Sequence, residues 1–326
     1  MIKINKDRIE INGYSITNTA DGIEINGNFE YAGDILPPPP MSGTVAGYTS
    51  GGTEPPYTNV IDKFQFATDA NATDVGDLTQ ARRGAAGQSS TENGYTSGGG
   101  FPRVDTIDKF PFATDANATD VGDLRFSRQF NAGQSSSENG YSSSGQSSPT
   151  TILNSIDKFP FATDANSTDV GDLTQRRLSS AGQSSTENGY TSGGQTPPYV
   201  NTIDKFPFAT DANATDVGNL TQTRGRAAGQ SSSENGYTSG GRLPAITNII
   251  DKFSFATDAN ATDVGDLTQG RYYSAGQSST ENGYTSGGQT PPNVNTIDKF
   301  PFAADANATD VGDLTQAKHS GAGQQD

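Results

Sequence analysis

The tetrapeptide Ile61-Asp62-Lys63-Phe64 occurs six times in this chain, and its spacing decides the fold. Its first residue stands at positions 61, 107, 156, 203, 250 and 297, so the intervals are 46, 49, 47, 47 and 47 residues. Six near-copies of one segment of about 47 residues therefore fill the chain from residue 43 onward. A fixed period of this length is typical of propellers and solenoids, in which each copy forms one supersecondary unit.

Each copy predicts four β-strands. In the first copy we expect them at residues 47–52 (Gly-Tyr-Thr-Ser-Gly-Gly), 60–66 (Val-Ile-Asp-Lys-Phe-Gln-Phe), 75–78 (Val-Gly-Asp-Leu) and 85–90 (Ala-Ala-Gly-Gln-Ser-Ser). The small residues of the last segment suit a crowded inner strand around a central axis. Because no segment has a sustained 3.6-residue apolar pattern, we assign the chain to the all-β class.

The two ends of the array complement each other. The last copy stops at residue 326, just before the Gly-Tyr-Thr-Ser-Gly-Gly strand, and the array begins with that strand at residues 47–52. An N-terminal strand that completes the last blade closes a ring and leaves no unpaired edge, whereas a rod would need a polar cap at each end. We therefore expect residues 43–326 to form a six-bladed β-propeller of four-stranded blades, closed by the N-terminal strand.

A different segment precedes the array. The sequence Ile-Glu-Ile-Asn-Gly occurs at residues 9–13 and 23–27, and isoleucines alternate with polar residues around it. This alternation, interrupted by Asn-Gly, predicts short strands joined by tight turns. We interpret residues 1–36 as a small β-rich segment for attachment or oligomerisation, and residues 37–42, with four prolines, as a stiff linker.

Composition limits the classes of function. The net charge is −16, from 37 acidic and 21 basic residues, which disfavours nucleic-acid binding because phosphates require a cationic surface. The chain has no cysteine, and its apolar fraction is only 31%, so its 16 Phe and 12 Tyr residues must supply much of the burial. The first residues lack the apolar core of a secretion signal, and no apolar run approaches 18 residues, so we expect no membrane insertion.

The repeat resembles the kelch repeat of β-propellers. Glycine doublets follow the first strand at Gly51-Gly52, Gly98-Gly99, Gly193-Gly194, Gly240-Gly241 and Gly287-Gly288, and a basic residue precedes the inner strand. The copies depart from the kelch pattern where Val75 and its equivalents replace a tryptophan, and where Tyr141-Ser-Ser-Ser-Gly145 lacks the doublet. Kelch propellers serve many functions, so the resemblance bears on the fold.

The layout of the whole chain resembles virion structural and tail-fibre proteins of tailed phages, especially marine ones. A short Ile-rich β segment, a proline spacer and near-identical Ser/Gly/Asp-rich copies carry this resemblance. It implies a non-enzymatic virion protein, made in the host cytoplasm, that contacts other virion proteins or a host-surface glycan or protein. The alternative is an extracellular, lectin-like carbohydrate-binding propeller of a bacterium.

Two repeated sets of residues are candidate binding sites. The basic residues before the inner strands would form a ring near one mouth of the channel and could hold an anionic ligand; alternatively, each pairs with Asp62 or one of its copies and ties blades together. These residues are Arg82, Arg128, Arg177, Arg224, Arg271 and Lys318. The turn with Asp69, Asn71, Thr73, Asp74 and Asp77 offers oxygen ligands for Ca²⁺, but it lacks the glycine and the closing glutamate of an EF-hand-type loop. We therefore favour a structural turn and expect no cofactor.

Catalysis has little support in the sequence. His319 is the only histidine, and near-identical blades leave little room for a singular pocket. The loops after the glycine doublets differ among the copies, and variable loops on a rigid frame are where binding function usually resides. These loops are residues 53–57, 100–104, 146–153, 195–199, 242–247 and 289–293.

Overall fold

The computed structural model describes residues 2–5, 8–11, 14–19, 22–26 and 43–326. The chain divides into two compact units, Met1–Pro38 and Pro39–Asp326. The predicted linker at residues 37–42 lies outside the described residues, as do residues 27–36 of the predicted attachment segment. None of the described residues belongs to a helix long and apolar enough to span a membrane.

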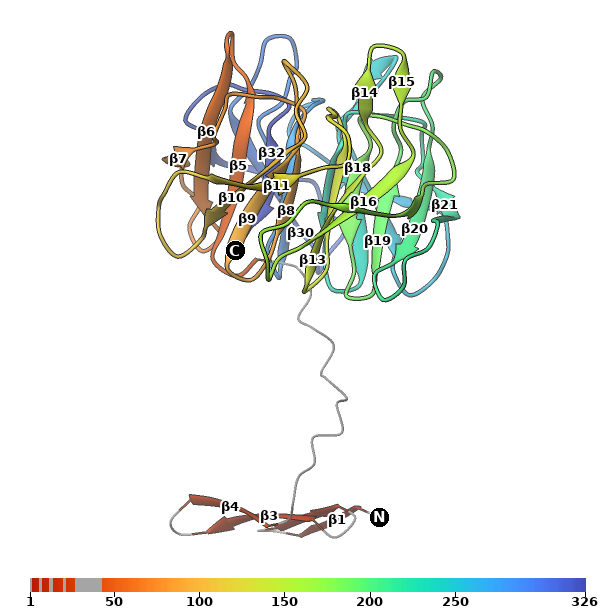
Figure 1. Ribbon diagram of the computed structural model, residues 1–326. Coiled ribbons are helices and arrows are strands. Elements are labelled where there is room, and N and C mark those ends of the chain that lie inside the picture. The colour runs from red at the N-terminus through yellow and green to blue at the C-terminus, as the bar shows by residue number, and fades with distance from the viewer. Residues whose placement is uncertain (1, 6–7, 12–13, 20–21, 27–42) are drawn as a thin grey trace. The chain divides into compact units, whose positions relative to one another are not determined.

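The first unit contains a four-stranded antiparallel sheet in the order β1-β2-β3-β4 (Figure 1). The strands are β1 (Ile2–Asn5), β2 (Arg8–Ile11), β3 (Tyr14–Thr19) and β4 (Gly22–Asn26). Their register pairs Ile4 with Ile9, Ile9 with Ile16, and Ile16 with Ile25. Because successive residues of a strand alternate between faces, this register assigns these isoleucine positions to one face of the sheet.

The second unit is a six-bladed β-propeller (Figure 1), and each blade is a four-stranded antiparallel sheet. From the inner to the outer strand, blade 1 contains β32 (Ala322–Gln325), β5 (Ala46–Thr53), β6 (Tyr57–Gln65) and β7 (Thr73–Asp77); blade 2 contains β8 (Ala86–Ser89), β9 (Asn93–Ser97), β10 (Thr106–Pro111) and β11 (Thr119–Asp123); blade 3 contains β12 (Ala132–Ser135), β13 (Asn139–Ser143), β16 (Ser155–Pro160) and β17 (Thr168–Asp172). Blade 4 contains β18 (Ala181–Ser184), β19 (Asn188–Ser192), β20 (Thr202–Pro207) and β21 (Thr215–Asn219); blade 5 contains β22 (Ala228–Ser231), β23 (Asn235–Ser239), β26 (Ile249–Ser254) and β27 (Thr262–Asp266); blade 6 contains β28 (Ala275–Ser278), β29 (Asn282–Ser286), β30 (Thr296–Pro301) and β31 (Thr309–Asp313). The prediction of an all-β, six-bladed propeller is confirmed.

The ring closes as the sequence predicts. The C-terminal strand β32 pairs with β5, so that Ala322 lies opposite Ser50 and Gln324 opposite Tyr48. Blade 1 therefore takes its inner strand from the end of the chain and its other three strands from the beginning of the array. No blade is left with an incomplete sheet.

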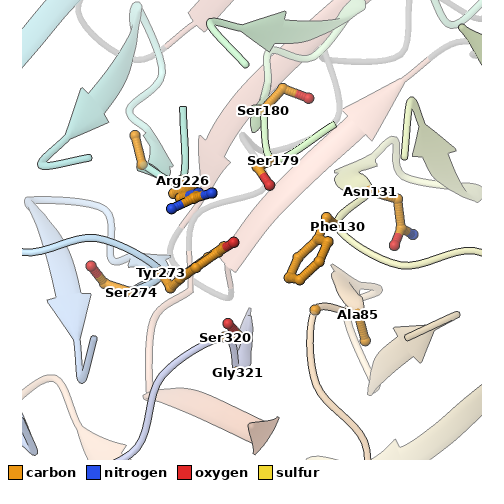
Figure 2. Close-up of a pocket in the computed structure, with 12 residues that line it drawn as sticks. Ala85, Phe130, Asn131, Ser179, Ser180, Arg226, Tyr273, Ser274, Ser320 and Gly321 are labelled. Atoms are coloured by element: carbon orange, nitrogen blue, oxygen red, sulfur yellow. The ribbon is translucent and has the colours of Figure 1, made fainter. Parts of the chain in front are cut away.

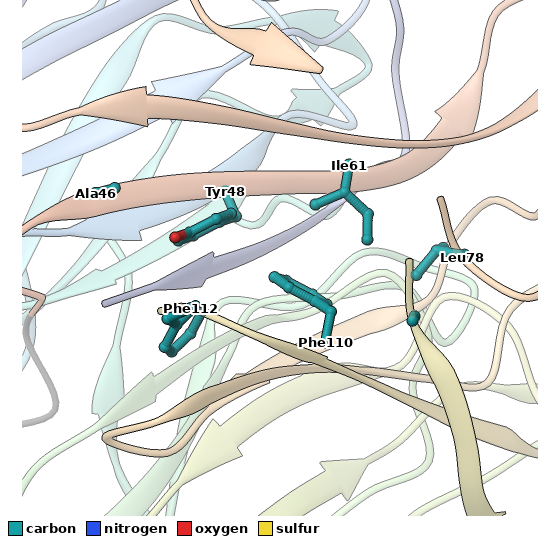
Figure 3. Packing of buried hydrophobic residues seen from close by; sticks show 7 residues of the cluster. Ala46, Tyr48, Ile61, Leu78, Phe110 and Phe112 are labelled. Atoms are coloured by element: carbon teal, nitrogen blue, oxygen red, sulfur yellow. The ribbon is translucent and has the colours of Figure 1, made fainter. Parts of the chain in front are cut away.

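Aromatic residues fill the space between neighbouring blades. Tyr48 of blade 1 packs against Phe110 and Phe112 of blade 2, with ring centroids 5.5 and 5.0 Å apart (Figure 3). Ile61 and Leu78 belong to the same buried cluster. The same triad recurs at all six interfaces, as Tyr95 with Phe159 and Phe161, Tyr141 with Phe206 and Phe208, Tyr190 with Phe253 and Phe255, Tyr237 with Phe300 and Phe302, and Tyr284 with Phe64 and Phe66. Each such pair of rings contributes about 0.5–1.5 kcal/mol beyond the burial of its area.

Glycine is required where the inner strands meet around the axis. A Cβ atom added to Gly182 would lie 2.1 Å from the carbonyl oxygen of Gly133 on the preceding inner strand. Equivalent glycines in the other five inner strands have the same close contact, at 2.0 to 2.2 Å. The small residues of these strands therefore allow the six sheets to converge on a narrow axis.

Replacing Gly182 with Ala should loosen the ring. The added methyl must push two inner strands apart, and overpacking of this kind costs about 1–3 kcal/mol of the free energy of unfolding. We expect urea denaturation of the full chain, followed by circular dichroism, to show that loss. Gly270→Ala is the matched control, because its Cβ would meet nothing closer than 3.4 Å. Equal stability of the two variants would contradict the tight convergence of the inner strands.

Candidate functional site

The six basic residues predicted to ring the mouth lie inside the propeller. Arg177 is in the connection that leads from blade 3 into blade 4, where it forms an ion pair with Asp204 of β20. Both side chains are 0% exposed. The other five basic residues pair in the same way, as Arg82 with Asp108, Arg128 with Asp157, Arg224 with Asp251, Arg271 with Asp298, and Lys318 with Asp62. The alternative prediction, pairing with Asp62 and its copies, is what the structure contains.

These ion pairs join each connection to the blade that follows it. Arg82 also donates to the carbonyl oxygen of Thr96, and Thr79 donates its backbone N–H and its hydroxyl to Asp108. Burial lowers the pKa of Arg82, an effect that the charge of Asp108 opposes. Such a buried charge needs its partner, because breaking the pair leaves an uncompensated ion away from water. The side chains are not exposed at the mouth, so this placement does not support direct ligand contact by them.

The Asp/Asn-rich turns dock each blade on the previous one. The Oδ1 atom of Asn117, in blade 2, accepts a hydrogen bond from the backbone N–H of Asp77 in blade 1, at 3.0 Å. Lys63 of blade 1 forms an ion pair with Asp115 of the same turn, at 3.2 Å. Within the described part of the chain, no group of three or more His, Cys, Asp or Glu side chains is placed to hold a metal ion. These oxygens therefore act in contacts between blades.

A closed ring of backbone hydrogen bonds surrounds the axis at one mouth of the propeller. It links six residues, each two positions after a core basic residue, and we call them the mouth ring: Gly84, Phe130, Ser179, Arg226, Tyr273 and Ser320. The N–H of each residue donates to the carbonyl oxygen of the residue before it around the ring, and the six N···O distances are 2.5 to 2.8 Å. Since only backbone atoms make this ring, it fixes the mouth without fixing which side chains stand there.

Every residue of the mouth ring has a positive φ, between 55° and 63°. Glycine adopts this left-handed conformation freely, whereas other residues lose about 1–2 kcal/mol in it. Only Gly84 is a glycine, so five side chains are present at a backbone cost. Strain of this kind clusters at functional sites, which makes the mouth ring the first candidate for a binding site.

The mouth ring is also where the otherwise similar copies differ. Together with the preceding residue, its members read Arg-Gly, Gln-Phe, Leu-Ser, Gly-Arg, Tyr-Tyr and His-Ser in the six copies. The mouth-ring residues, together with the residues that follow them, line a hollow with a cavity volume of about 80 Å³. Figure 2 shows Phe130, Tyr273 and Arg226 directed from three connections toward the centre of this hollow.

The variable loops lie at the same face. Each loop forms a β-bridge with the residue that precedes a mouth-ring residue, so that Arg83 pairs with Gly100 and Tyr272 with Gln289. Two loops contain small hairpins, β14 (Gln146–Ser148) with β15 (Thr151–Ile152), and β24 (Arg242–Leu243) with β25 (Ala245–Ile246). We call the mouth ring, the residues preceding it and these six loops the variable face. The structure thus unites two sets of variable residues that are about 20 positions apart in each copy.

Cations and aromatic rings form a continuous stack across the mouth. Arg226 lies over Tyr273 at 4.8 Å, and Tyr273 stacks on Phe130 with centroids 5.4 Å apart. Arg83 lies 5.7 Å from the centre of the Phe130 ring and 4.8 Å from that of Phe101. Tyr273 and Phe130 enter blades 6 and 3, which are opposite each other in the ring, so this stack bridges the axis.

His319 belongs to the same cluster. Its ring stacks on Tyr273 at 5.6 Å, and its Nδ1 atom lies 2.9 Å from the hydroxyl of Ser320. Burial, and then the positive charge of Arg83, lower the pKa of His319 to about 4. The imidazole is therefore neutral near pH 7, and it acts as an aromatic and hydrogen-bonding group.

Each basic residue singled out in the sequence is two positions before a mouth-ring residue. Those basic residues were chosen because they repeat in every copy. In this protein, the residues that repeat make the contacts that hold the blades together. The signal for the mouth was the opposite one: a pair of adjacent residues that is different in each of the six copies, separated by one residue from an invariant Ala-Gly-Gln segment. The variable loops singled out in the sequence lie at equivalent positions around the ring, because each of them bridges to one of these residues.

Comparison with known proteins does not assign this chain to a family. The chain matches no protein-family model, and its comparison with curated proteins gives no match.

We expect Arg177→Met to destabilise the propeller by about 3–5 kcal/mol, because it leaves the carboxylate of Asp204 buried without its cation. Urea unfolding of the full chain measures this loss. Arg176→Met, at the exposed neighbouring position, is the control and should change little. In a double-mutant cycle with Asp204→Asn, the combined variant should lose less stability than the sum of the two single changes. Additive losses would show that the two groups are not coupled.

As the single histidine, His319 gives an unambiguous imidazole signal in an NMR titration, and we expect it to titrate near pH 4. The pKa is about 6.5 in the unfolded chain, so the unfolded state binds the proton first. The contribution of this group to stability is therefore complete above about pH 6.5 and is lost as the pH falls toward 4. Arg83→Gln should raise the pKa, because it removes the nearby positive charge. A midpoint near 6.5 in the folded protein would contradict the buried, cation-flanked placement.

Proposed function

We propose that the chain is a non-enzymatic structural and binding protein of a tailed-phage particle, a fibre, tail or capsid-associated protein. In this proposal, the propeller contacts a host-surface glycan or protein, or a neighbouring virion protein. The observation that carries the proposal is the concentration of sequence variation on one face of an otherwise repeated frame. A repeated frame with one variable face is suited to recognition, since the ligand-contacting side chains can change while the contacts between blades do not.

The sheet β1–β4 is the proposed attachment segment. Its register brings isoleucine positions together on one face, and a small four-stranded sheet gains stability by covering such a face. We propose that a second copy of this chain covers it, because identical sheets with this alternation can pack isoleucine face to isoleucine face. Oligomerisation would present several propellers together and increase the avidity for a repetitive surface.

The absence of an enzymatic role is also part of the proposal. His319 is held neutral within an aromatic stack, and the buried charged groups of the frame are engaged in ion pairs. We further propose that the blades are kelch-like. The glycine doublets have the positive φ angles that such a turn requires, as with 63° at Gly51 and 123° at Gly52. A sequence profile built from homologues of this chain that failed to align with kelch repeats would remove this likeness.

One observation favours the alternative, an extracellular lectin-like propeller of a bacterium. Hollows repeat between neighbouring blades, away from the variable face, and two of them have cavity volumes of about 450 Å³ each. The first is lined by Glu138, Asn139, Glu187, Asn188 and Phe208, a mixture of hydrogen-bonding and aromatic groups suited to a neutral sugar. Equivalent hollows around a ring would give multivalent binding without a unique pocket.

Purified particles of the phage that encodes this chain should contain it at a fixed stoichiometry, and antibody labelling in electron micrographs should locate it on the particle. Ile9→Glu combined with Ile16→Glu, a cross-strand pair in the sheet β1–β4, should abolish self-association in light scattering because it places two charges on the isoleucine face. We expect the melting of the propeller to be unchanged.

The matched control is Glu10→Gln combined with Ser15→Ala, the neighbouring cross-strand pair on the opposite face. This control should leave both self-association and the presence of the chain on phage particles unchanged. Recovery of the chain only as free protein, never on particles, would overturn the virion proposal in favour of the lectin-like alternative. Light scattering that gives a monomer for the unchanged chain would overturn the proposed role of the sheet.

A further inference from the structure

The variable face carries positive charge in a strongly acidic protein. In the described part of the chain, Arg83, Arg103, Arg226 and Arg242 have no ion-pair partner, whereas the six basic residues of the core each have an aspartate. No aspartate or glutamate is among the residues that line the mouth hollow. Arg83, Arg226 and Arg242 lie over aromatic rings instead, as Arg226 does over Tyr273 and Arg242 over Tyr272. Arg103 donates a hydrogen bond to Oε1 of Gln146, at 3.1 Å. A ring face orients a guanidinium without neutralising it.

Several polar atoms around the hollow also lack a hydrogen-bond partner among the described residues. They are Oγ of Ser274, Oδ1 of Asn131, Nε of Arg226, and Oγ of Ser179, whose one neighbouring group is the phenol of Tyr273, outside good hydrogen-bond geometry. Ser179 is only 6% exposed, yet it lines the hollow, and Figure 2 shows its hydroxyl turned toward the centre. Buried polar groups are nearly always paired, so unpaired ones that face a hollow indicate that something else completes their hydrogen bonds.

The stack of Phe130 on Tyr273 divides the mouth into two sides. Ser179 and Arg226 follow Phe130 around the ring and come before Tyr273, so they occupy one side together. The charged guanidinium of Arg226, the hydroxyl of Ser179 and the partly exposed aromatic side chains therefore border the same space. The cavity volume of the hollow, about 80 Å³, is below that of sites that enclose a drug-sized ligand, so a ligand here would be held at an open mouth and not enclosed.

We propose that this side of the mouth binds the carboxylate-bearing ring of an acidic sugar, with Arg226 on the carboxylate and Ser179 on a ring hydroxyl. Arginine matches a carboxylate because its planar donors can bind both oxygens. A simple inorganic anion would leave an acceptor such as Oδ1 of Asn131 unpaired, whereas sugar hydroxyls can donate to it. The apolar C–H groups of a sugar ring would contact the edges of Phe130 and Tyr273. The inference rests on the proposed function as a binding protein and specifies the ligand of its variable face.

The backbone prepares this site before any ligand arrives. The closed hydrogen-bond ring fixes the Cα positions of all six mouth residues, and the stack across the axis limits the rotamers of the aromatic residues. Binding to a rigid site loses less conformational entropy than binding to mobile loops. This preorganisation also explains why the five non-glycine residues can be kept at positive φ.

The test uses the full chain and two sugars that differ only at one carbon, sodium D-glucuronate and D-glucose. We expect glucuronate to shift the NMR signal of His319, which stacks on Tyr273, and to release heat in calorimetry, while glucose does neither. The affinity for glucuronate should fall as sodium chloride is added, since salt screens the attraction between charges. Acetate is a third probe, which presents the carboxylate without the ring.

Arg226→Gln should weaken glucuronate binding about tenfold to a hundredfold, the usual loss for a hydrogen bond between charged groups. Arg176→Gln is the matched control; it removes the same charge from an exposed residue outside the hollow and should leave the affinity unchanged. Both variants should have the same melting temperature as the unchanged chain, and a thermal scan checks this. Equal effects of Arg226→Gln and Arg176→Gln would overturn the site.

The remaining outcomes separate this inference from the proposed function. Equal shifts with acetate and glucuronate would overturn recognition of the sugar ring. Binding of glucose as strong as that of glucuronate, or no response to glucuronate well above millimolar concentration, would overturn the anionic site, and the virion assignment would stand or fall on the particle experiment alone. Binding of glucuronate by a chain that never occurs on particles would support the site and contradict the virion assignment.

Discussion

The rest of the structure depends on the contact between neighbouring blades, because a ring closes only if six such contacts together make one full turn. The contact is the same each time: a tyrosine from one blade packs against two phenylalanines of the next, which also contact each other edge to face. The sixth copy of this contact joins Tyr284 to Phe64 and Phe66, at opposite ends of the array. An altered angle at one interface would have to be compensated at the others. Closure therefore constrains every residue at the interfaces and explains why the copies are nearly identical there.

Charge is distributed in the same repeated way. Buried basic residues pair with buried aspartates where each connection enters its blade, and half-exposed lysines pair with the aspartates of the next turn. The exposed pairs contribute little, about 0–1 kcal/mol each. The buried pairs specify geometry more than they add stability, since a wrong pairing would leave a charge in the interior. Both kinds of pair help to select one register of each blade against the next, which matters in a chain whose copies could otherwise exchange partners.

Most of the fold could be predicted from the sequence, because the period of the Ile-Asp-Lys-Phe segments and the missing final strand are direct consequences of ring closure. The role of Arg82 and its copies could not be settled in the same way. A basic residue before an inner strand fits both a channel-facing ring and a buried ion pair, and only the direction of the side chain distinguishes the two. The mouth ring was missed for a different reason. Its positive φ angles are carried by Phe, Ser, Arg and Tyr, residue types that do not indicate a left-handed conformation, so propensity predicted nothing at these positions.

The same positions show how one frame can combine strict repetition with variety. The hydrogen-bond ring at the mouth uses only N–H and C=O groups, so its six positions accept a glycine, a hydroxyl, an arginine or a large aromatic ring without losing a bond. Neighbouring positions of the mouth ring limit each other's size. At Gly84, a Cβ atom would lie 2.7 Å from the ring of Phe130. A large side chain at one position is thus accommodated by a small one at the next. Since the contacts that close the ring lie elsewhere, between the blades, changes at the mouth leave closure intact. Recognition can therefore vary at the mouth while the propeller beneath it stays the same.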